Sequence, residues 1–265
     1  MFTELVQHRK LHDRDPRLGG LVDKVTVKAW VAQQLGQKWV TPTLWTGSAL
    51  PALPPWPRPF VVKSRHGCRQ HAFVRTDDED WAAIRREARR WMRGTYGRWL
   101  DEWAYSGLTP GLLVEPFIGK DGALPIDYKF FVFAGHVAYI QVHLGREHDH
   151  RWILLDRDWR RVSARTSDPD PAPPRALAAM IVAAEALGRE FPFVRVDLYA
   201  NGDHPRFGEM TFYPGSGLDP FAPVSLDARL GTDWLAALGG SSQLGSGSHA
   251  AAADIASSLT PCPST

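Results

Sequence analysis

Apolar side chains spaced three and four positions apart predict three helices. In residues 23–35 this spacing follows Asp23, a candidate N-cap, and ends at Gly36, a candidate helix stop. Residues 79–93 and 173–190 show the same periodicity. The first of these two segments carries an arginine-rich outer face, which fits a helix with one side in solvent.

Shorter apolar runs with turn residues between them predict strands. Residues 61–75 read as strand, tight loop and strand, and residues 111–118 read as one strand. Residues 127–144 predict a hairpin that turns at Ala134-Gly135. Residues 193–212 predict a second hairpin, because Asn201-Gly202-Asp203 between two apolar runs is a strong turn signal.

The second hairpin gathers four polar side chains on one face. If its turn is centred near Asp203, Asp197 lies opposite Glu209 and Arg195 lies opposite Thr211. All four positions are odd, so the two-residue period of a strand directs them to the same side. The other side receives the apolar residues Val194, Val196, Leu198, Met210 and Phe212.

Two carboxylates directly across a strand pair repel each other unless a positive charge lies between them. A pair of carboxylates suits Mg²⁺, which takes oxygen ligands and shares its shell with substrate phosphates. A solvent-facing hairpin side, with Arg195 screening Asp197 and Glu209, explains the same pattern without a metal. The pattern alone leaves both interpretations open.

Length and composition limit the remaining classes. The 265 residues suffice for one large or two small domains, and 44% hydrophobic with 23% charged residues is typical of a globular protein. A formal net charge of +2 does not support a nucleic-acid partner. Cys68 and Cys262 form neither a disulfide framework nor a metal-ligand set, and no apolar run is long enough to span a membrane. We therefore expect a cytoplasmic protein without a membrane span.

Several separated segments resemble one known family. The run R-x-D … E-x-T-x-x-P-G-S-G, which begins at Arg195, resembles the metal-binding end of ATP-grasp ligases. With the segments DKVTVKAWV, LPIDYKFFVFAGHVAYIQV, FPFVRVDLY and FGEMTFYPGSG, the chain resembles the TupA-like ATP-grasp family from about residue 20 to about residue 231. That family is associated with bacterial cell-surface polymer and peptide-conjugate biosynthesis.

The resemblance implies an α+β fold of the ATP-grasp type, in which two subdomains with antiparallel sheets sandwich the nucleotide. We expect residues 1–50 to be an N-terminal, partly helical segment, and residues 51–118 to be the small, lid subdomain. Residues 119–238 would form the large subdomain with the metal site. The Gly-, Ser- and Ala-rich residues 239–265 predict a disordered tail.

The resemblance also implies an activity, the ATP-dependent joining of a carboxylate to an amine through an acyl phosphate. Asp197 and Glu209 would hold Mg²⁺, with Thr211 in the place of the usual Asn ligand. Arg195 would stabilise charge on the transferring phosphoryl group or the acyl phosphate. Lys63, at the end of the strand PFVVK, would reach the ATP phosphates.

Further positions match the family's nucleotide contacts. Glu115 corresponds to the hinge acid that contacts adenosine, Asp127 to a ribose-binding position, and Lys129 to a phosphate or substrate contact. For both Lys63 and Lys129, a plain surface lysine on a strand is the alternative. The loop after Lys63 departs from the family pattern, because SRHGCRQHAF contains only one glycine, Gly67. His66 and its basic neighbours could supply donors there, or the loop could be degenerate and bind ATP poorly.

Other functions remain open at this stage. The chain could be a phosphotransferase that acts on a sugar or small molecule, or a nucleotide-binding protein without catalysis. The arginine-rich helix could bind an anionic polymer. His143, His148 and His150 could bind zinc, although a loop that offers Arg146 or Arg151 to phosphate is the stronger interpretation. The expected substrates are small-molecule, peptide or glycan carboxylates and amines, and the sequence leaves the oligomeric state undetermined.

Overall fold

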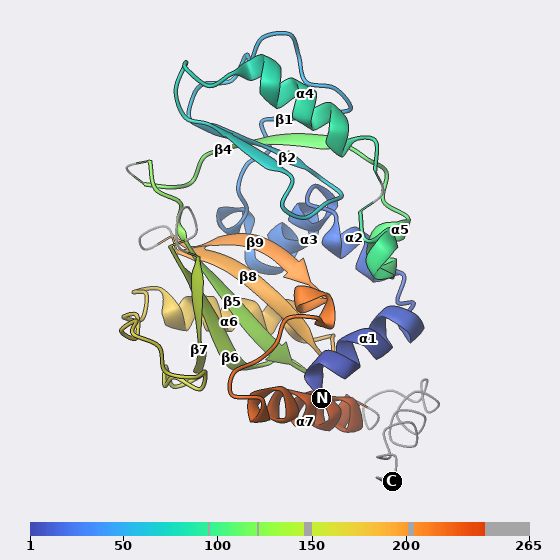
Figure 1. Ribbon diagram of the computed structural model, residues 1–265, viewed down its shortest axis with the longest axis vertical. Helices are drawn as coiled ribbons and strands as arrows, with labels where there is room; N and C mark the ends of the chain where they lie inside the picture. The colour runs from blue at the N-terminus through green and yellow to red at the C-terminus, as the bar shows by residue number, and fades with distance from the viewer. Residues whose placement is uncertain (95, 121, 146–149, 201–203, 242–265) are drawn as a thin grey trace.

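The computed structural model describes residues 1–94, 96–120, 122–145, 150–200 and 204–241. They form a mixed α+β fold with two antiparallel sheets, which confirms the predicted fold class. Figure 1 shows the smaller sheet above the larger one, with the N-terminal helices beside both. No helix in these ranges is long and apolar enough to cross a membrane.

The small sheet has the strand order β1-β4-β2-β3. Its strands are β1 (Trp45–Gly47), β2 (Phe60–Ser64), β3 (His71–Val74) and β4 (Leu112–Pro116). Helix α4 (Trp81–Trp91) covers one face, and its buried Ala88 and Trp91 join Phe60, Val62 and Val114 in a separate core. Asp80 caps this helix by accepting a hydrogen bond from the Ala83 amide at 2.9 Å.

The large sheet has the strand order β7-β6-β5-β8-β9. Its strands are β5 (Ile126–Phe133), β6 (His136–Leu144), β7 (Arg151–Asp156), β8 (Val194–Ala200) and β9 (Arg206–Thr211). The predicted turn at Ala134-Gly135 is confirmed, since Phe133 pairs with His136 and both turn residues have positive φ, as a type I′ hairpin requires.

The register of the β8–β9 hairpin is the predicted one where the polar residues lie. Arg195 pairs with Thr211 and Asp197 with Glu209. A β-bulge then shifts the pairing by one residue, so that Leu198 faces Phe207. The predicted turn at residues 201–203 lies outside the described residues.

Helices pack on both faces of the large sheet. Helix α6 (Leu177–Gly188) contacts β5, β6 and β8, and α3 (Thr26–Leu35) packs against α6. Helix α7 (Ser225–Ser241) contacts α1 (Phe2–His12) and β5, and it includes the start of the predicted tail. Shorter helices are α2 (Arg17–Val22), α5 (Trp103–Ser106) and the 3₁₀ turns Gln37–Trp39, Arg98–Leu100 and Pro214–Gly217.

The three predicted helices are present, and the boundary residues of α3 act as expected. Asp23 Oδ1 accepts hydrogen bonds from the amides of Val25 and Thr26, and Gly36 ends the helix with a φ of 90°. The division at residues 50/51 and 118/119 remains a prediction. The structure adds that β1 joins the small sheet and that α1, α2 and α3 contribute to the core of the large one.

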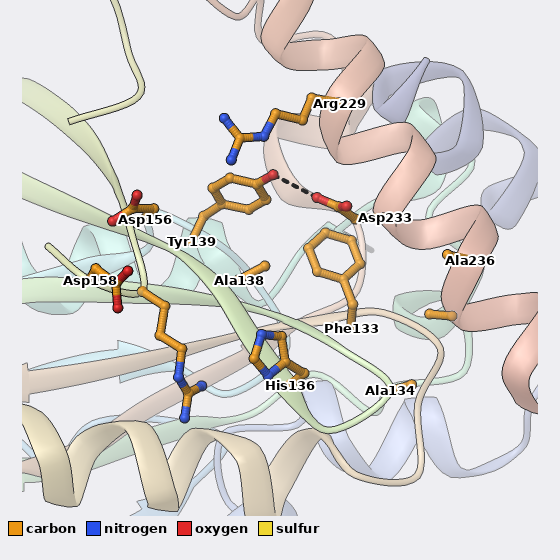
Figure 2. Close-up of a pocket in the computed structure, with 12 residues that line it drawn as sticks. Phe133, Ala134, His136, Ala138, Tyr139, Asp156, Asp158, Arg229, Asp233 and Ala236 are labelled. Atoms are coloured by element: carbon orange, nitrogen blue, oxygen red, sulfur yellow. Dashed lines mark hydrogen bonds between the residues drawn. The ribbon is translucent and has the colours of Figure 1, made fainter. Parts of the chain in front are cut away.

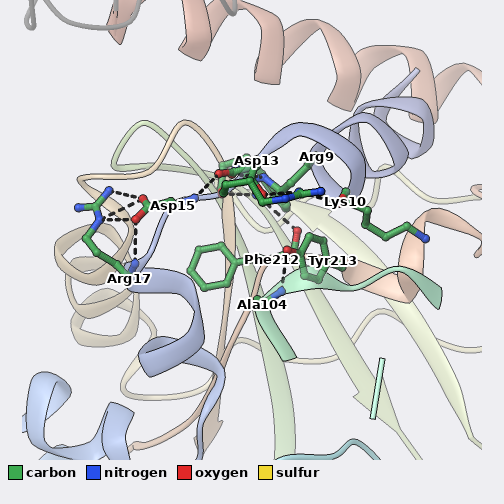
Figure 3. A network of polar contacts seen from close by, with 10 residues as sticks. Arg9, Lys10, Asp13, Asp15, Arg17, Ala104, Phe212 and Tyr213 are labelled. Atoms are coloured by element: carbon green, nitrogen blue, oxygen red, sulfur yellow. Dashed lines mark hydrogen bonds and ion pairs between the residues drawn. The ribbon is translucent and has the colours of Figure 1, made fainter. Parts of the chain in front are cut away.

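A buried arginine fixes α1 to the end of the large sheet. The Arg9 guanidinium donates to the carbonyl oxygen of Phe193 at 2.8 Å and lies over the Trp234 ring at 4.5 Å. It also forms an ion pair with Asp13 at 3.4 Å, and Figure 3 shows both residues. Burial lowers the pKa of Arg9 to about 10, while Asp13 raises it, so the side chain stays charged at neutral pH. Because an unpaired buried charge is costly, these partners determine where α1 packs.

Candidate functional site

The four polar residues of the hairpin and Lys129 of β5 form one cluster on the large sheet. Asp197 pairs with Glu209 on one side and with Lys129 on the other, so the three side chains project from neighbouring strands to the same face. The predicted cross-strand meeting of Asp197 and Glu209 is therefore confirmed. Thr211 Oγ1 donates to Glu209 Oε1 at 3.2 Å and completes the row.

Asp197 lies at the centre of this cluster and is fully buried. Arg195 donates to it twice, from Nε to Oδ1 at 2.7 Å and from Nη2 to Oδ2 at 2.8 Å. The Lys129 ammonium also pairs with Oδ2, and it contacts Asp127 at 2.8 Å. Burial would raise the pKa of Asp197, but Arg195 and Lys129 outweigh it and hold the pKa at about 2.

Arg195 connects the two acidic residues. Besides its bonds to Asp197, its Nη2 lies 3.1 Å from Thr211 Oγ1 and 3.5 Å from Glu209 Oε1. Burial would lower the pKa of Arg195, yet Asp197 and then Glu209 raise it above the ordinary arginine value. The positive charge that two facing carboxylates require is thus supplied by the chain itself.

A second charged cluster lies on the small sheet, where the sequence predicted Lys63 and Glu115. Lys63 Nζ contacts Glu115 Oε2 at 2.6 Å, and Lys28 of α3 pairs with Glu115 Oε1. Burial would raise the pKa of Glu115, but Lys63 and Lys28 lower it, so the carboxylate is charged. The structure therefore brings Lys63 and Glu115 together, with Lys28 as a partner that the sequence did not suggest.

Lys24 joins the two clusters, and sequence reasoning assigned it no role. Its ammonium group donates to the carbonyl oxygen of Gly67 in the loop after β2. Burial lowers the pKa of Lys24, Glu209 of the large sheet raises it, and Lys63 of the small sheet lowers it. Lys24 is therefore within electrostatic reach of a charged residue on each sheet. The only available signal was its place in the segment DKVTVKAWV.

The loop after β2 is held by side chains rather than by glycines. Arg65 forms an ion pair with Asp23 at 2.6 Å. The buried His66 ring accepts from the Gly111 amide at 3.2 Å and contacts the Trp91 carbonyl oxygen at 3.2 Å. A Cβ atom on Gly67 would lie 2.2 Å from Gln70 Oε1, so any larger residue there would require the Gln70 side chain to move. The contacts of His66 with Gly111 and Trp91 tie the loop to its neighbours, and its predicted contact with a nucleotide stays a prediction.

Only part of the histidine-rich stretch is described. His143 Nδ1 lies 2.7 Å from His150 Nε2, whereas His148 and Arg146 lie outside the described residues. Arg151 pairs with Asp168. The described parts of the chain contain no group of three or more His, Cys, Asp or Glu side chains arranged to hold a metal ion.

The donors at Asp197, Glu209 and Thr211 nevertheless fit Mg²⁺ in one respect. All three offer oxygen, and Mg²⁺ in nucleotide sites needs only one or two carboxylates besides substrate phosphates and water. Glu209 is the accessible member, with 38% of its side chain exposed. Asp197 is 2% exposed and its oxygens already accept from Arg195 and Lys129, so an ion would share it with those cations.

Two cavities lie against the large sheet, and the smaller one is lined by a residue of the charged cluster. A cavity of about 440 Å³ lies between β6, α7 and the turn after β7, where Tyr139 donates to Asp233 at 2.6 Å (Figure 2). It shares no lining residue with either charged cluster. A smaller cavity of about 40 Å³ is lined by Arg195, Gln141 and Asp219, among others. We place the candidate active site at the two charged clusters, because the strand pairing brings their charged side chains together. The volume of a cavity does not by itself indicate chemistry.

Comparisons with known proteins gave one family match and several similar folds. The sequence model of one family, described as TupA-like ATPgrasp, matches residues 4–235. The comparison with curated proteins gave no match.

Among solved structures, a D-alanine–D-alanine ligase from Bacillus anthracis is 14% identical, with a TM-score of 0.50 over 85% of this chain and 69% of the other. The ATP-grasp ligase PsnB, solved with a precursor variant, Mg and ADP, is 14% identical with a TM-score of 0.42, covering 83% and 60%. An L-amino acid ligase from Bacillus licheniformis is 19% identical with a TM-score of 0.43, covering 75% and 42%. The chain thus spans less than two thirds of the length of PsnB and of the L-amino acid ligase. The match to the D-alanine–D-alanine ligase shows a shared fold.

Proposed function

Because the chain belongs to the TupA-like ATP-grasp family, we propose that it is an ATP-dependent ligase that joins a carboxylate to an amine through an acyl phosphate. The observation that carries the proposal is the pairing of Asp197 with Glu209, with Arg195 and Lys129 between and beside them. Lys63 and Lys24 supply positive charge from the small-sheet side of the same region. Such a concentration of fixed charges suits a reaction that transfers a phosphoryl group.

Each charged residue has a role in this proposal. Glu209, Asp197 and Thr211 would hold Mg²⁺, which neutralises charge on the ATP phosphates when it is bound. Lys63 and Lys129 would bind phosphate oxygens, and Glu115 and Asp127 would orient the adenosine. The backbone of Gly67, which has no side chain of its own in the way, would cover the phosphates.

The reaction would proceed in two steps. A carboxylate oxygen of the substrate attacks the γ-phosphorus, ADP leaves, and an acyl phosphate forms. The Arg195 guanidinium stabilises the developing negative charge, and its own contacts with Asp197 and Thr211 keep it oriented. The amine then attacks the acyl carbon, and inorganic phosphate leaves with the electron pair of the broken C–O bond.

We propose that the substrates are amino acids, peptides or glycan acids that contribute to a cell-surface polymer or a peptide product made in the cytoplasm. The family's association with such pathways supports this, as do the relatives whose printed names describe ligases of D-alanine and of L-amino acids.

The test measures ADP release with Mg²⁺ over a panel of amino acids, uronic acids and short peptides, with the Asp197→Ala variant in parallel. We expect release that depends on both a carboxylate and an amine, and its loss in the variant. Asp158→Ala, an exposed change far from the cluster, serves as the matched control. Equal behaviour of wild type and Asp197→Ala would contradict the metal assignment. A stable phosphate ester in place of free phosphate would identify a phosphotransferase.

One observation favours a second candidate, nucleotide binding without catalysis. The loop over the phosphates has a single glycine, and its His66 ring is held by Gly111 and Trp91 rather than free to follow a ligand. Calorimetric titration with Mg·ATP decides between the two: binding with no ADP release for any pair of substrates supports this candidate and contradicts the ligase.

A further inference from the structure

The outer side of α4 carries a concentration of positive charge that the proposed reaction does not use. Residues 85–98 contain six arginines and one carboxylate, Glu87, whereas the entire chain has a formal net charge of only +2. The rest of the chain is therefore net acidic. Figure 1 shows α4 at the end of the molecule opposite α7, with the small sheet beneath it.

Four of these arginines lie along one face of the helix. They are exposed, and they form the arginine stripe: Arg86, Arg89, Arg90 and Arg93. Their spacing is three and four residues, which places side chains next to one another on a helix surface. Arg93 follows the last residue of α4, but its amide donates to the Arg90 carbonyl oxygen at 3.1 Å, so the winding continues to it. With a rise of 1.5 Å per residue, the stripe is about 10 Å long.

The fold of the small sheet does not require this stripe. The side of α4 that packs on the sheet contributes the buried residues Ala88 and Trp91. Like charges four residues apart, such as Arg86 and Arg90, destabilise a helix. Cations in the last turn interact favourably with the helix dipole, which offsets this cost at Arg90 but not at Arg86 in the middle of the helix. A local conflict of this kind is expected where a surface serves binding.

The stripe is only partly neutralised by the chain itself. Arg86 lies 3.7 Å from Asp80, and Arg90 lies 2.9 Å from Glu87; all four side chains are exposed. Exposed ion pairs contribute little to stability, so they exchange readily for other partners. Within the part of the chain that the structure describes, the other two arginines of the stripe form no ion pair. A partner with carboxylates spaced by one helical turn would pair with the stripe without breaking a buried contact.

An exposed tryptophan near the stripe indicates which class of anion fits. Trp99 is 80% exposed and follows Arg93 by six residues, which span at most about 20 Å. Tryptophan and arginine are the side chains that most often carry the binding energy of protein–protein interfaces. A long phosphate backbone is less suitable, because the remainder of this chain is net acidic and repels it. The combination favours a polypeptide with carboxylates on one face.

The helix that bears the stripe is attached to the loop after β2. The carbonyl oxygen of Trp91, the last residue of α4, contacts the His66 ring of that loop at 3.2 Å. A polypeptide bound to the stripe would therefore be held on the same sheet as the loop proposed to cover the phosphates.

We propose that the arginine stripe is a docking surface for an acidic helical segment of a polypeptide partner. Carboxylates at positions i, i+3, i+4 and i+7 of such a segment repeat the spacing of the stripe, so two helices side by side bring each guanidinium to a carboxylate. Arginine binds carboxylates through two parallel hydrogen bonds, which fixes the relative position of the two chains. Docking requires neither nucleotide nor catalysis, so it goes beyond the proposed ligase function.

Fluorescence anisotropy with the full chain and no nucleotide tests the docking surface. The probe is a labelled, helix-forming 20-residue peptide with glutamates at i, i+3, i+4 and i+7 and a leucine near one end. Its isomer has the same composition, with the glutamates spread around the helix. We expect the probe to bind at least 10-fold more tightly than the isomer, and to bind more weakly as the salt concentration rises. The combined variant Arg86→Gln, Arg89→Gln and Arg93→Gln should weaken binding of the probe about 30-fold.

A matched variant separates the stripe from net charge. Arg160→Gln, Arg165→Gln and Arg175→Gln together remove the same charge from exposed positions elsewhere on the chain, and they should leave the Kd at the wild-type value. Trp99→Ala should raise the Kd several-fold, because it removes an aromatic contact for the leucine. Urea unfolding should find the stripe variant at least as stable as wild type, since it relieves repulsion between like charges.

Several results would overturn the proposal. No binding of the probe, or an equal loss in the matched variant, would refute a docking surface at the stripe. Equal binding of the isomer, tighter binding of a single-stranded 20-nucleotide DNA, or an unchanged Kd in Trp99→Ala would contradict an acidic helix as the partner. A less stable stripe variant would show that the arginines serve the fold. These measurements involve no ADP release, so they decide the docking surface whether or not the ligase function holds.

Discussion

The Asp197→Asn substitution tests the charged cluster through protein stability. Asp197 is buried and paired with Arg195 and Lys129, which lower its pKa from 3.8 to about 2. A lowering of about this size between the unfolded and the folded state corresponds to roughly 2 kcal/mol of folding free energy. The amide also leaves two buried cations with a neutral partner, so we expect a total loss of about 2 to 4 kcal/mol at pH 7.

The lowered pKa of Asp197 also determines how the stability difference between wild type and variant changes with pH. Because the folded-state pKa is lowered, the contribution of Asp197 is complete above about pH 4, the unfolded-state value, and is lost as pH falls toward 2. The gap between the unfolding free energies of wild type and variant should therefore narrow over that interval. Urea unfolding followed by tryptophan fluorescence from pH 7 to pH 2 measures it. A gap that is absent at pH 7, or that stays constant with pH, would refute the reasoning. Asp158→Asn, with 68% of its side chain exposed, should change stability by less than about 0.5 kcal/mol.

Three further predictions concern the small sheet. Gly67→Ala should raise the KM for ATP several-fold in steady-state kinetics, because the new methyl group displaces the Gln70 side chain of the loop. Gly94→Ala, a change at a glycine with open space around it, should leave the KM at the wild-type value. Glu115→Gln leaves two lysines without their carboxylate, so calorimetry should show weaker ATP binding, and an unchanged Kd would argue against the contact with adenosine. Asp80→Ala removes the cap of α4 and should cost about 1 kcal/mol in urea unfolding, with no change in KM.

The sequence was most informative where two strands meet at a short turn. The period of two placed Asp197 and Glu209 on one face, and the structure confirms this pairing. The sequence does not predict the bulge beyond them. The predicted register assumes one constant offset from the turn, and one extra residue in β9 changes that offset. The predicted pairing of Asp197 with Glu209 is therefore confirmed, whereas the pairing between the bulge and the turn differs from the predicted one by one residue.

Contacts between distant segments were not accessible to pattern reasoning. The strand β1 is three residues long, and α1 begins with Phe2, whose burial depends on Phe193 and Trp234 far along the chain. Lys24 and Lys28 appear in the sequence as ordinary charged positions of an amphipathic helix. Their roles follow from the contact of Lys24 with the loop after β2 and of Lys28 with Glu115 of β4, which no local period encodes.

The attachment of α3 has a consequence for any attempt to dissect the chain. Asp23 neutralises Arg65 of the small sheet, and β1 completes that sheet along the edge of β4. A fragment that starts at residue 51 would lose both, leaving Arg65 without its counter-charge and β4 with an unpaired edge open to other chains. We therefore expect residues 51–118 to fold poorly as a separate fragment. Part of what stabilises the small sheet comes from residues before position 51, several of which pack in the core of the large sheet.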